Sequence, residues 1–346
     1  MLEPNGAAAA PPLLEVNGLT KRFPVRDGLF PIARNYVHAV DRVTFTLQQR
    51  ETLGIVGESG CGKSTLARMI VRLIEPSEGS VRLRGVELTA LSAKAMRGHR
   101  RDIQFIFQDP YASLNPRLGA GEIVGEAIEN FEPAHRDAVR ERVARLFARV
   151  GLRPEQMDKF PHEFSGGQRQ RLGIARALSL NPSIIVADEP VSALDVSVQA
   201  QVINLMIDLQ EEFGLSYLFI AHDLAVVQHI SDRVAVMYLG RIVELAPRRT
   251  LFRAPLHPYT EALLDSVPVP DPTLRRDKEV LSGEVPSPMR PPPGCRFHTR
   301  CPLVEPRCRH VAPPMVEAIP GQFVACHVRA PAPQVDVTAL SAETLS

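Results

Sequence analysis

The first hundred residues of the chain carry the short apolar runs that are typical of β-strands. Leu14–Val16 and Val37–Leu47 hold the first two runs, and the third, Thr52–Val56, is apolar almost throughout. Further short alternating runs occupy residues 80–107 and end in Ile103–Phe107. Alternating runs indicate half-buried strands and continuous runs indicate buried ones, so this pattern predicts a strand-rich beginning.

Helical spacing takes over in the middle of the chain. One apolar face recurs at helical intervals, at Val139, Val143, Leu146, Phe147 and Val150. Gly151 follows this face and is expected to end the helix. The block between about 109 and 164 is therefore predicted to be a helical insertion within an α/β core.

The core resumes after this block. Residues 183–187 are predicted to form a strand, 198–213 a long amphipathic helix, and 215–221 another strand. Alternating strands and helices predict a mainly parallel sheet flanked by helices. The fold class is therefore α/β, preceded by a separate strand-rich segment.

Proline dominates the last hundred residues. Residues 246–346 contain 18 of the 31 prolines and four of the five cysteines. Proline lacks an amide N–H and resists the interiors of helices and sheets. This C-terminal region is therefore predicted to be irregular and to need another source of order.

Composition and charge indicate a globular protein and argue against some classes of function. The 346 residues are 45% hydrophobic and 23% charged, as in a globular chain long enough for two or three domains. A net charge of +1 argues against a nucleic-acid partner. No apolar run approaches the roughly 18 residues that span a bilayer. Residues 1–12 lack the basic start of a signal peptide and are expected to form a disordered tail.

The strongest chemical signal lies between the strand at 52–56 and a helix that starts near residue 65. Glycines there let backbone amides turn inward, and a helix N-terminus adds its positive dipole end. Lys63 is expected to reach the β- and γ-phosphates of a nucleotide, and the Ser64 hydroxyl to bind Mg²⁺. A chance glycine turn is the alternative, which the strand and helix on either side disfavour. The phosphate-loop pattern G-x-x-x-x-G-K-[ST] is fitted by Gly57, Glu58, Ser59, Gly60, Cys61, Gly62, Lys63 and Ser64, with Thr65 completing the predicted ATP-binding set.

Two carboxylates end the apolar strand at 184–189. Asp188 and Glu189 are expected at the ligand edge of a parallel sheet, where strands present their carboxyl ends. We expect Asp188 to hold Mg²⁺, directly or through water, and Glu189 to polarise the water that attacks the γ-phosphate. The alternative interpretation is a surface acidic pair at a strand end, and the phosphate loop elsewhere in the chain argues for the catalytic one.

A second pair of glycines lies just before an arginine-rich helix that is predicted to start at residue 169. Ser165, Gly166, Gly167 and Gln168 precede it, and Ser-x-x-Gln fits a plain capping box. Two glycines behind a serine at a helix N-terminus also make an anion site. Because one phosphate loop already serves one nucleotide, we expect this second site to serve a nucleotide held by another subunit.

These motifs, in this order, resemble the ATP-binding cassette ATPases over residues 13–250. The resemblance implies a P-loop NTPase core with an antiparallel β subdomain and an inserted helical subdomain. It implies that Gln108 touches Mg²⁺ and the membrane partner, that Asp195 in Ser192–Asp195 crosses a dimer interface, and that His222 contacts the γ-phosphate. It also matches Phe23 to the aromatic residue that stacks on adenine, although a core phenylalanine is the alternative there.

The resemblance narrows to the oligopeptide and dipeptide importer ATPases and then extends to residue 329. It rests on residues 108–116, on His257-Pro258-Tyr259-Thr260 and on residues 283–288. It implies an ATP-hydrolysing motor that closes as a head-to-tail dimer with a related second ATPase, beneath two transmembrane permease subunits fed by an extracytoplasmic solute-binding protein. It places the chain on the cytoplasmic face of a bacterial inner membrane, with domains at 13–250 and 251–329 and a flexible tail at 330–346.

The four C-terminal cysteines form the last strong pattern: Cys295, Cys301, Cys308 and Cys326. Four thiolates can bind one metal centre, and a metal would order a region that lacks a core. Some members of the resembled importer family bind a [4Fe–4S] cluster through such a tail, which implies one here. Zn²⁺ is the rival, kept open by His298, His310 and His327, although the tight cysteine knuckles of zinc sites are absent. Free thiols are the third possibility.

Other functions stay open at this stage. The same motor for nickel or another small solute is one alternative to a peptide importer. A soluble cassette protein that acts on DNA or ribosomes is another, but such proteins usually carry two cassettes or a long coiled coil. A metal-binding regulator with a vestigial ATPase is the third, and intact Lys63, Asp188, Glu189 and His222 argue against it.

Overall fold

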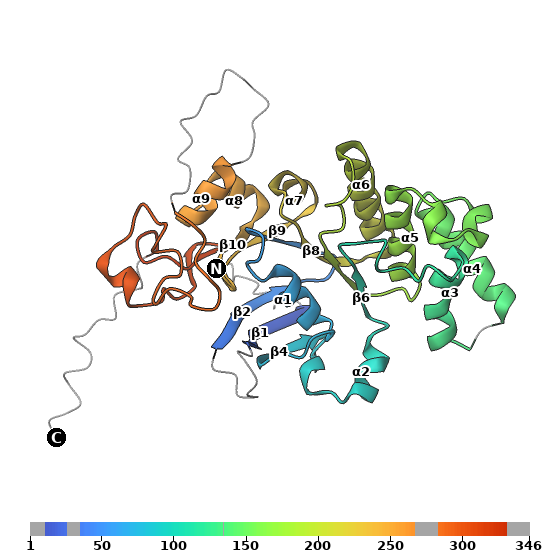
Figure 1. Cartoon of the computed structure of the whole chain (residues 1–346), viewed down its shortest axis with the longest axis horizontal. Coiled ribbons are helices and arrows are strands. Elements are labelled where there is room, and N and C mark those ends of the chain that lie inside the picture. The colour runs from blue at the N-terminus through green and yellow to red at the C-terminus, as the bar shows by residue number, and fades with distance from the viewer. Residues whose placement is uncertain (1–10, 26–34, 134, 267–282, 331–346) are drawn as a thin grey trace, which may run out of the picture.

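The computed structural model describes residues 11–25, 35–133, 135–266 and 283–330. The tails expected at 1–12 and 330–346 lie outside the described residues, apart from residues 11, 12 and 330. Two β-sheets with helices around them make up the described chain (Figure 1). Within the described ranges, no helix is both long enough and apolar enough to cross a membrane.

The smaller sheet is antiparallel and comes from the beginning of the chain. Its strands are β1 (Leu14–Val25), β2 (Asn35–Leu47), β4 (Glu78–Leu83) and β5 (Val86–Glu87). They are ordered β2-β1-β4-β5. The buried side of β1 shares one apolar cluster with helix α1 (Lys63–Ile70), so this sheet supports the helix that follows the phosphate loop.

The larger sheet has eight strands, of which five neighbours are parallel. These five are β3 (Thr52–Val56), β6 (Ile103–Ile106), β7 (Ile184–Asp188), β8 (Ser216–Ile220) and β9 (Arg233–Tyr238), in the order β9-β3-β8-β7-β6. Every residue of β3, β7 and β8 is buried, as expected for parallel strands covered on both faces. The strands predicted at 52–56, 183–187 and 215–221 are confirmed.

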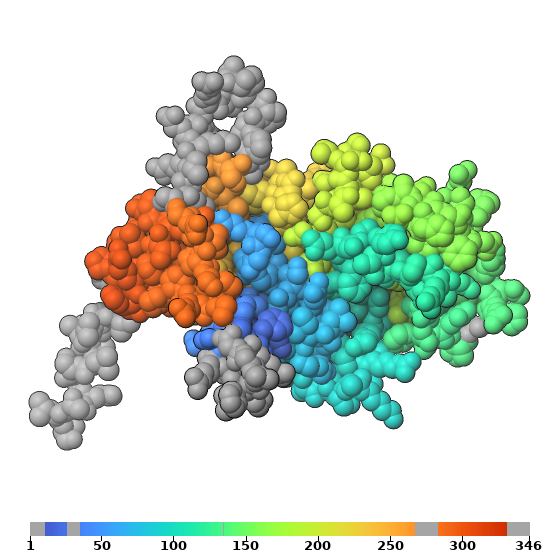
Figure 2. All heavy atoms as spheres, viewed as in Figure 1, coloured from blue at the N-terminus to red at the C-terminus, as the bar shows by residue number. Residues whose placement is uncertain are grey.

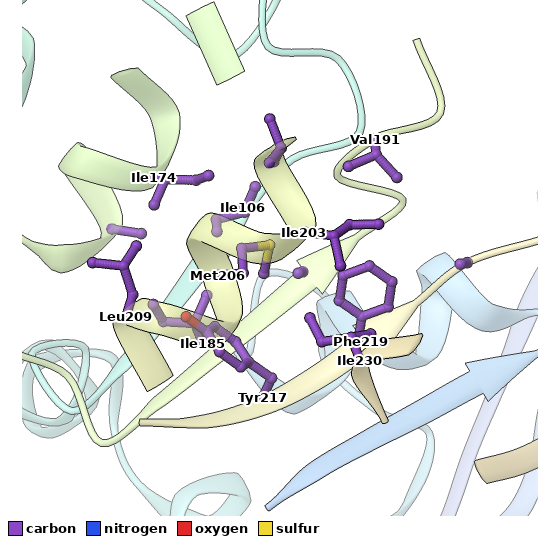
Figure 3. Packing of buried hydrophobic residues seen from close by; sticks show 14 of the residues in the cluster. Ile106, Ile174, Ile185, Val191, Ile203, Met206, Leu209, Tyr217, Phe219 and Ile230 are labelled. Carbon is purple, nitrogen blue, oxygen red and sulfur yellow. The ribbon is translucent and has the colours of Figure 1, made fainter. Parts of the chain in front are cut away.

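Helix α6 (Val196–Phe213) covers one face of this parallel sheet, and α7 (Leu224–Ile230) lies beside it. Figure 3 shows Met206 and Leu209 of α6 against Ile185 and Tyr217 of the strands, within one buried cluster. Each such side chain contributes about 1.5–3 kcal/mol of hydrophobic stabilisation relative to exposure. The amphipathic helix predicted at 198–213 is confirmed, and it ends at Gly214 with φ of +64°.

The predicted helical block is present between β6 and β7. It holds α3 (Ala120–Phe131), α4 (Arg136–Arg149) and short 3₁₀ turns at Pro154–Asp158 and Pro161–Glu163, and it continues into α5 (Gly166–Leu178). The predicted apolar face of α4 is buried, and Gly151 follows the helix with φ of +74°. In Figure 1 this block lies at the opposite end of the molecule from the C-terminal region.

One helix was not predicted in the early part of the chain. Short alternating runs were the pattern noted in residues 80–107, and no helix was predicted there, but α2 (Ala93–His99) lies among them. Ser92 caps this helix by accepting a hydrogen bond from the amide of Ala95. A seven-residue helix with one buried residue, Met96, gives too weak an apolar face to be found from its period.

The C-terminal region is largely irregular, as expected, but it extends the large sheet. After β10 (Arg241–Pro247) come α8 (Arg248–Arg253), α9 (Pro258–Asp265) and a 3₁₀ turn at Pro306–Arg309. Strands β11 (Val316–Ile319) and β12 (Gln322–Val324) then pair antiparallel with each other, and β12 pairs with β10.

A buried carboxylate ties these C-terminal pieces together. Glu244 on β10 is fully buried and accepts hydrogen bonds from the amides of Leu256 and His257 and from Nε2 of Gln322, each at 2.9 Å. One side chain therefore links three segments: β10, the residues just before α9, and β12. Strand pairing and buried polar contacts therefore supply the order that was expected to need another source in this proline-rich region.

Candidate functional site

The loop between β3 and α1 has a backbone that needs glycine at two positions. Gly57 has φ of +152° and Gly62 has φ of +107°. A Cβ atom at Gly57 would lie 2.1 Å from the carbonyl oxygen of Met237, and one at Gly62 would lie 2.0 Å from that of Ala39. Both neighbours are backbone atoms, so neither position tolerates a side chain. The first turn of α1 holds no acidic residue, which suits its N-terminus to an anion.

Lys63 lies across this loop. The residue is only 4% exposed, and its Nζ donates hydrogen bonds to the carbonyl oxygens of Gly57 at 2.7 Å and Glu58 at 3.1 Å. Both acceptors are neutral, and no carboxylate in the described part of the chain forms a hydrogen bond or ion pair with this ammonium group. This charge is therefore free to attract a phosphate group bound at the loop.

Ser64 and Asp188 form an oxygen site at the carboxyl end of β7. The Ser64 hydroxyl donates to Oδ1 of Asp188 at 2.8 Å, and Asp188 is only 1% exposed. Its Oδ2 atom is buried without a hydrogen-bond partner among the described residues. Burial raises the pKa of this carboxyl above its ordinary value, because desolvation disfavours the charged form. An orphaned carboxylate oxygen beside a hydroxyl fits Mg²⁺, which prefers oxygen ligands.

Glu189, Gln108 and His222 meet beside this pair. Glu189 follows β7 in a left-handed conformation, φ +46°, which costs a non-glycine residue about 1–3 kcal/mol. Its Oε2 accepts a hydrogen bond from Nε2 of Gln108 at 2.9 Å and lies 3.4 Å from Nδ1 of His222. The three residues follow the neighbouring strands β6, β7 and β8, so the three predicted catalytic side chains are brought together at one sheet edge.

A small hollow adjoins this trio. It has a volume of about 30 Å³, and its lining includes Glu189, Ser192 and His222. That volume is above the roughly 10–15 Å³ that a cavity needs to hold one water molecule. The Ser192 hydroxyl donates to the carbonyl oxygen of Glu189 at 3.1 Å, so the turn that leads to α6 begins at Glu189 itself.

The second glycine pair lies at the exposed start of α5. Ser165 caps the helix by accepting from the amide of Gln168, whose side-chain oxygen accepts the Ser165 amide in return. Gly166 is exposed, whereas a Cβ at Gly167 would lie 2.5 Å from Val198 of α6. Asp195 is exposed at the start of α6. Between described residues, no hydrogen bond or ion pair joins this loop to the phosphate loop.

Phe23 lies half-buried on β1, opposite Val37 of β2. Two residues further along β2, the carbonyl oxygen of Ala39 is the backbone atom that lies against Gly62. Nζ of Lys21 lies 5.1 Å from the centroid of the Phe23 ring. The ring therefore lies on β1, which is paired with the strand that borders the phosphate loop, and its stacking on adenine stays a prediction.

Two residues that contact the phosphate loop, Tyr259 and Arg300, were not predicted as site residues from the sequence. The amide of Glu58 donates to the Tyr259 hydroxyl at 2.9 Å, and its carboxylate forms a two-point ion pair with Arg300 at 3.0 and 3.1 Å. Tyr259 belongs to the His-Pro-Tyr-Thr motif of the C-terminal region, but the motif did not reveal what it touches. These partners stand 201 and 242 positions away, so no local pattern could reveal them.

The prediction of an iron–sulfur cluster is wrong. All four C-terminal cysteines are described, and no group of three or more His, Cys, Asp or Glu side chains in the described ranges is gathered to hold a metal ion. Cys295 and Cys301 instead pack against the main apolar cluster, whereas Cys326 packs with Val324 and Ala330 in a separate one. Burial raises the pKa of Cys301 to about 11, which favours the neutral thiol over the thiolate that metals bind.

The rival zinc site has no support either. Nδ1 of His298 lies 2.8 Å from the carbonyl oxygen of Cys295, and Nε2 of His327 lies 2.9 Å from that of Val311. Both rings are therefore engaged by the backbone. The prediction of a metal relied partly on the need to order this region, and strand pairing and the Glu244 contacts already do so.

Comparisons with known proteins agree with this geometry. Residues 40–192 match the family described as ABC transporter, and residues 243–308 match the one described as oligopeptide/dipeptide transporter, C-terminal region. A probable peptide ABC transporter ATP-binding protein of Sinorhizobium fredii is 58% identical over 92% of this chain and 91% of its own length. The oligopeptide transport ATP-binding protein AppF of Bacillus subtilis is 55% identical over 93% and 99%. A dimeric ATP-binding cassette solved with ADP and phosphate matches with a TM-score of 0.61 and 29% identity, over 68% of this chain and 99% of that one.

Proposed function

This chain belongs to the ATP-binding cassette family, among its oligopeptide transport ATP-binding proteins, and from that premise we propose how it works as the ATP-hydrolysing motor subunit of a peptide importer. The reaction is hydrolysis of ATP to ADP and phosphate. The observation that carries the assignment of roles is the meeting of Gln108, Glu189 and His222 beside the Ser64–Asp188 pair.

The phosphate loop binds the triphosphate. The loop from Gly57 to Thr65 offers its amides and the start of α1, and Lys63 turns its ammonium from the loop carbonyls to the β- and γ-phosphates. Phe23 stacks on the adenine. Because phosphoryl transfer needs mainly positioning and charge neutralisation, these contacts supply much of the catalysis.

Ser64, Asp188 and Gln108 hold the magnesium ion of Mg²⁺–ATP through their oxygen atoms. When bound, Mg²⁺ neutralises charge on the phosphates. The unpartnered Oδ2 of Asp188 supports this role, because a buried carboxylate oxygen without a donor is costly unless a cation meets it.

Glu189 acts as the general base. It accepts a proton from the attacking water, and its left-handed backbone together with the Gln108 contact fixes the direction of the carboxylate. His222, whose Nδ1 lies 3.4 Å from the same carboxylate oxygen, contacts the γ-phosphate. The hollow beside Glu189 has room for one water molecule.

A second subunit completes each nucleotide site. Ser165, Gly166, Gly167 and Gln168 present an exposed helix start to the nucleotide of the partner, and Asp195 crosses the interface. ATP then binds the closed dimer better than the open one, so its binding shifts the population toward closure and hydrolysis reverses the shift. The dimeric form of a matching cassette supports this arrangement.

The remaining assignments concern the assembly. The mate is a related second ATPase, and the pair works beneath two transmembrane permease subunits that receive peptide from an extracytoplasmic solute-binding protein. The chain is peripheral, on the cytoplasmic face of a bacterial inner membrane. Residues 13–250 form the nucleotide-binding domain and residues 251–329 the C-terminal domain. The match of residues 243–308 to the oligopeptide/dipeptide transporter region supports peptide rather than nickel as cargo.

Reconstitution tests this function directly. The full chain is co-expressed with its second ATPase and permeases, purified as a complex and placed in vesicles with the solute-binding protein and a labelled peptide. Peptide uptake that requires Mg²⁺–ATP, and that stops when this chain carries Glu189→Gln, is expected. A complex that hydrolyses ATP without moving peptide would assign the motor to another cargo.

A further inference from the structure

The amide, the carboxylate and the carbonyl oxygen of Glu58 each have a hydrogen-bond partner, and two of the three partner residues come from the C-terminal region. Its amide donates to the Tyr259 hydroxyl at 2.9 Å, and its carboxylate pairs with both terminal nitrogens of Arg300 at 3.0 and 3.1 Å. Its carbonyl oxygen in turn accepts a hydrogen bond from Nζ of Lys63 at 3.1 Å. A single residue therefore connects the C-terminal region to the lysine that faces the nucleotide.

These partners are rigidly placed. Arg300 is 8% exposed and Tyr259 is fully buried, so neither contact is a loose surface pair. The segment that carries Arg300 is anchored by Phe297. The centroid of its ring lies 5.5 Å from that of the Tyr259 ring and 5.3 Å from that of the Tyr238 ring. A two-point arginine–carboxylate pair fixes direction as well as distance.

Arg296 adds a second anchor on the same segment. It donates to the side chain of Asp41 on β2 and to the carbonyl oxygen of Leu239, which follows β9. Figure 2 shows the C-terminal residues, in orange and red, packed directly against the blue part of the chain that carries the phosphate loop. The position of Arg300 is therefore set by the framework of the sheets.

Charge gives this contact a further role. The carboxylate of Glu58 lies in the loop that receives a triphosphate, and like charges repel strongly where water is sparse. The guanidinium of Arg300 neutralises that carboxylate. Removal of Arg300 would leave a negative charge on the loop and would release the backbone that holds Lys63.

We propose that Arg300 and Tyr259 are positioning residues for ATP: they fix Glu58, and through it Lys63, so that the C-terminal region sets the affinity of the phosphate loop for nucleotide. The inference rests on the proposed role of that loop as the ATP site. It assigns to the C-terminal region a direct part in nucleotide binding, in addition to the transport function of the whole chain.

The test measures equilibrium binding of a fluorescent ATP analogue with Mg²⁺, and steady-state kcat and KM, for the full-length chain. Arg300→Ala is expected to raise Kd and KM about 10-fold, within the 5–150-fold span of typical coupling between sites, and to change kcat much less. Arg300→Lys recovers part of the loss because it restores the charge without the two-point geometry. The double variant Glu58→Gln/Arg300→Ala binds more tightly than Arg300→Ala, because the uncompensated carboxylate is gone.

Arg329→Ala is the matched control. This arginine also lies in the C-terminal region and pairs with Glu261 at 2.9 Å, but both side chains are more than a third exposed. Wild-type binding is expected for it. Equal Kd values for Arg300→Ala and the wild type overturn the inference and leave the ATP site standing, whereas a wild-type chain that binds no nucleotide overturns the proposed function. If Arg300→Ala does not fold, Tyr259→Phe decides: it removes one hydroxyl, and an unchanged Kd overturns the inference.

Discussion

The hydroxyl of Ser64 donates a 2.8 Å hydrogen bond to Oδ1 of Asp188, and this contact joins the first turn of α1 to the carboxyl end of β7. The two residues stand 124 positions apart in the chain. The pair brings a hydroxyl and a carboxylate to the sheet edge where Glu189 also lies, and Oδ2 of that carboxylate has no hydrogen-bond partner among the described residues.

Asp188→Asn tests the oxygen site. An asparagine keeps the volume and an acceptor for Ser64, and it removes a charge that burial already disfavours. We expect an unchanged or higher Tm without nucleotide, together with a loss of Mg²⁺-dependent hydrolysis of about 10²–10³-fold, the usual cost of removing one electrostatic contact to the transition state. Thermal unfolding and Mg²⁺ titrations of ATPase activity measure both. Asp158→Asn, at an exposed ion pair, is the control, and full Mg²⁺-dependent activity in Asp188→Asn would contradict the assignment.

Glu189→Gln separates binding from chemistry. The amide retains the shape of the side chain and its contact with Gln108, but it cannot take a proton from water. Turnover is expected to fall by about 10²–10⁴, the range for a general base, while ATP still binds. Phosphate release and equilibrium nucleotide binding are measured on the same preparation. Wild-type turnover in this variant would show that another group is the base, and Glu141→Gln, on an exposed helix face, should behave as the wild type.

Gly166→Asp tests the partner's site without harming the fold. A Cβ at Gly166 makes only an ordinary 3.5 Å contact with Leu194, and a negative charge suits a helix N-terminus. Stability is therefore expected to hold, whereas the aspartate should repel the phosphate of a nucleotide carried by the other subunit. Loss of ATPase activity and of ATP-dependent dimers, seen by light scattering, is the expected result. Gly166→Ala serves as the neutral control, and full activity of the aspartate variant would argue against a shared site.

His257 makes stability depend on pH. It is 1% exposed, and burial lowers its pKa from 6.5 to about 3, so the folded chain keeps it neutral. Below pH 6.5 the unfolded chain binds a proton that the folded chain does not, so stability falls with falling pH, by at most about 1.4 kcal/mol per unit for this residue. His257→Asn keeps an acceptor for the Tyr259 amide. In this variant the free energy of unfolding, measured with urea, should change less between pH 6.5 and pH 5 than in the wild type. An equally steep fall in stability with falling pH in His257→Asn and in the wild type would contradict the assignment to His257.

Much of the site could be predicted because its signals are local. Gly57, Lys63 and Ser64 fall within eight residues, and a strand before them and a helix after them give the loop its form. The meeting of Gln108, Glu189 and His222 also follows from sequence, since each comes just after a parallel strand and such strands end at one edge.

The C-terminal region could not be predicted in the same way. Its order comes from residues far apart in the chain, such as Glu244 with Gln322 and Glu58 with Arg300, and no periodic pattern encodes such pairs. The metal site was predicted wrongly for a related reason: the sequence does not show these contacts, so a metal was favoured as the source of order. Helix α2 was missed because it buries a single residue.

The separation of Glu58 from Arg300 has a consequence for biosynthesis. The ribosome adds the arginine 242 residues after the glutamate. At the usual 5–20 residues per second, that interval lasts about 12–48 s. For that time a nascent cassette lacks the arginine that pairs with Glu58, so under the role proposed for Arg300 its affinity for nucleotide reaches its final value only after residue 300 has been added.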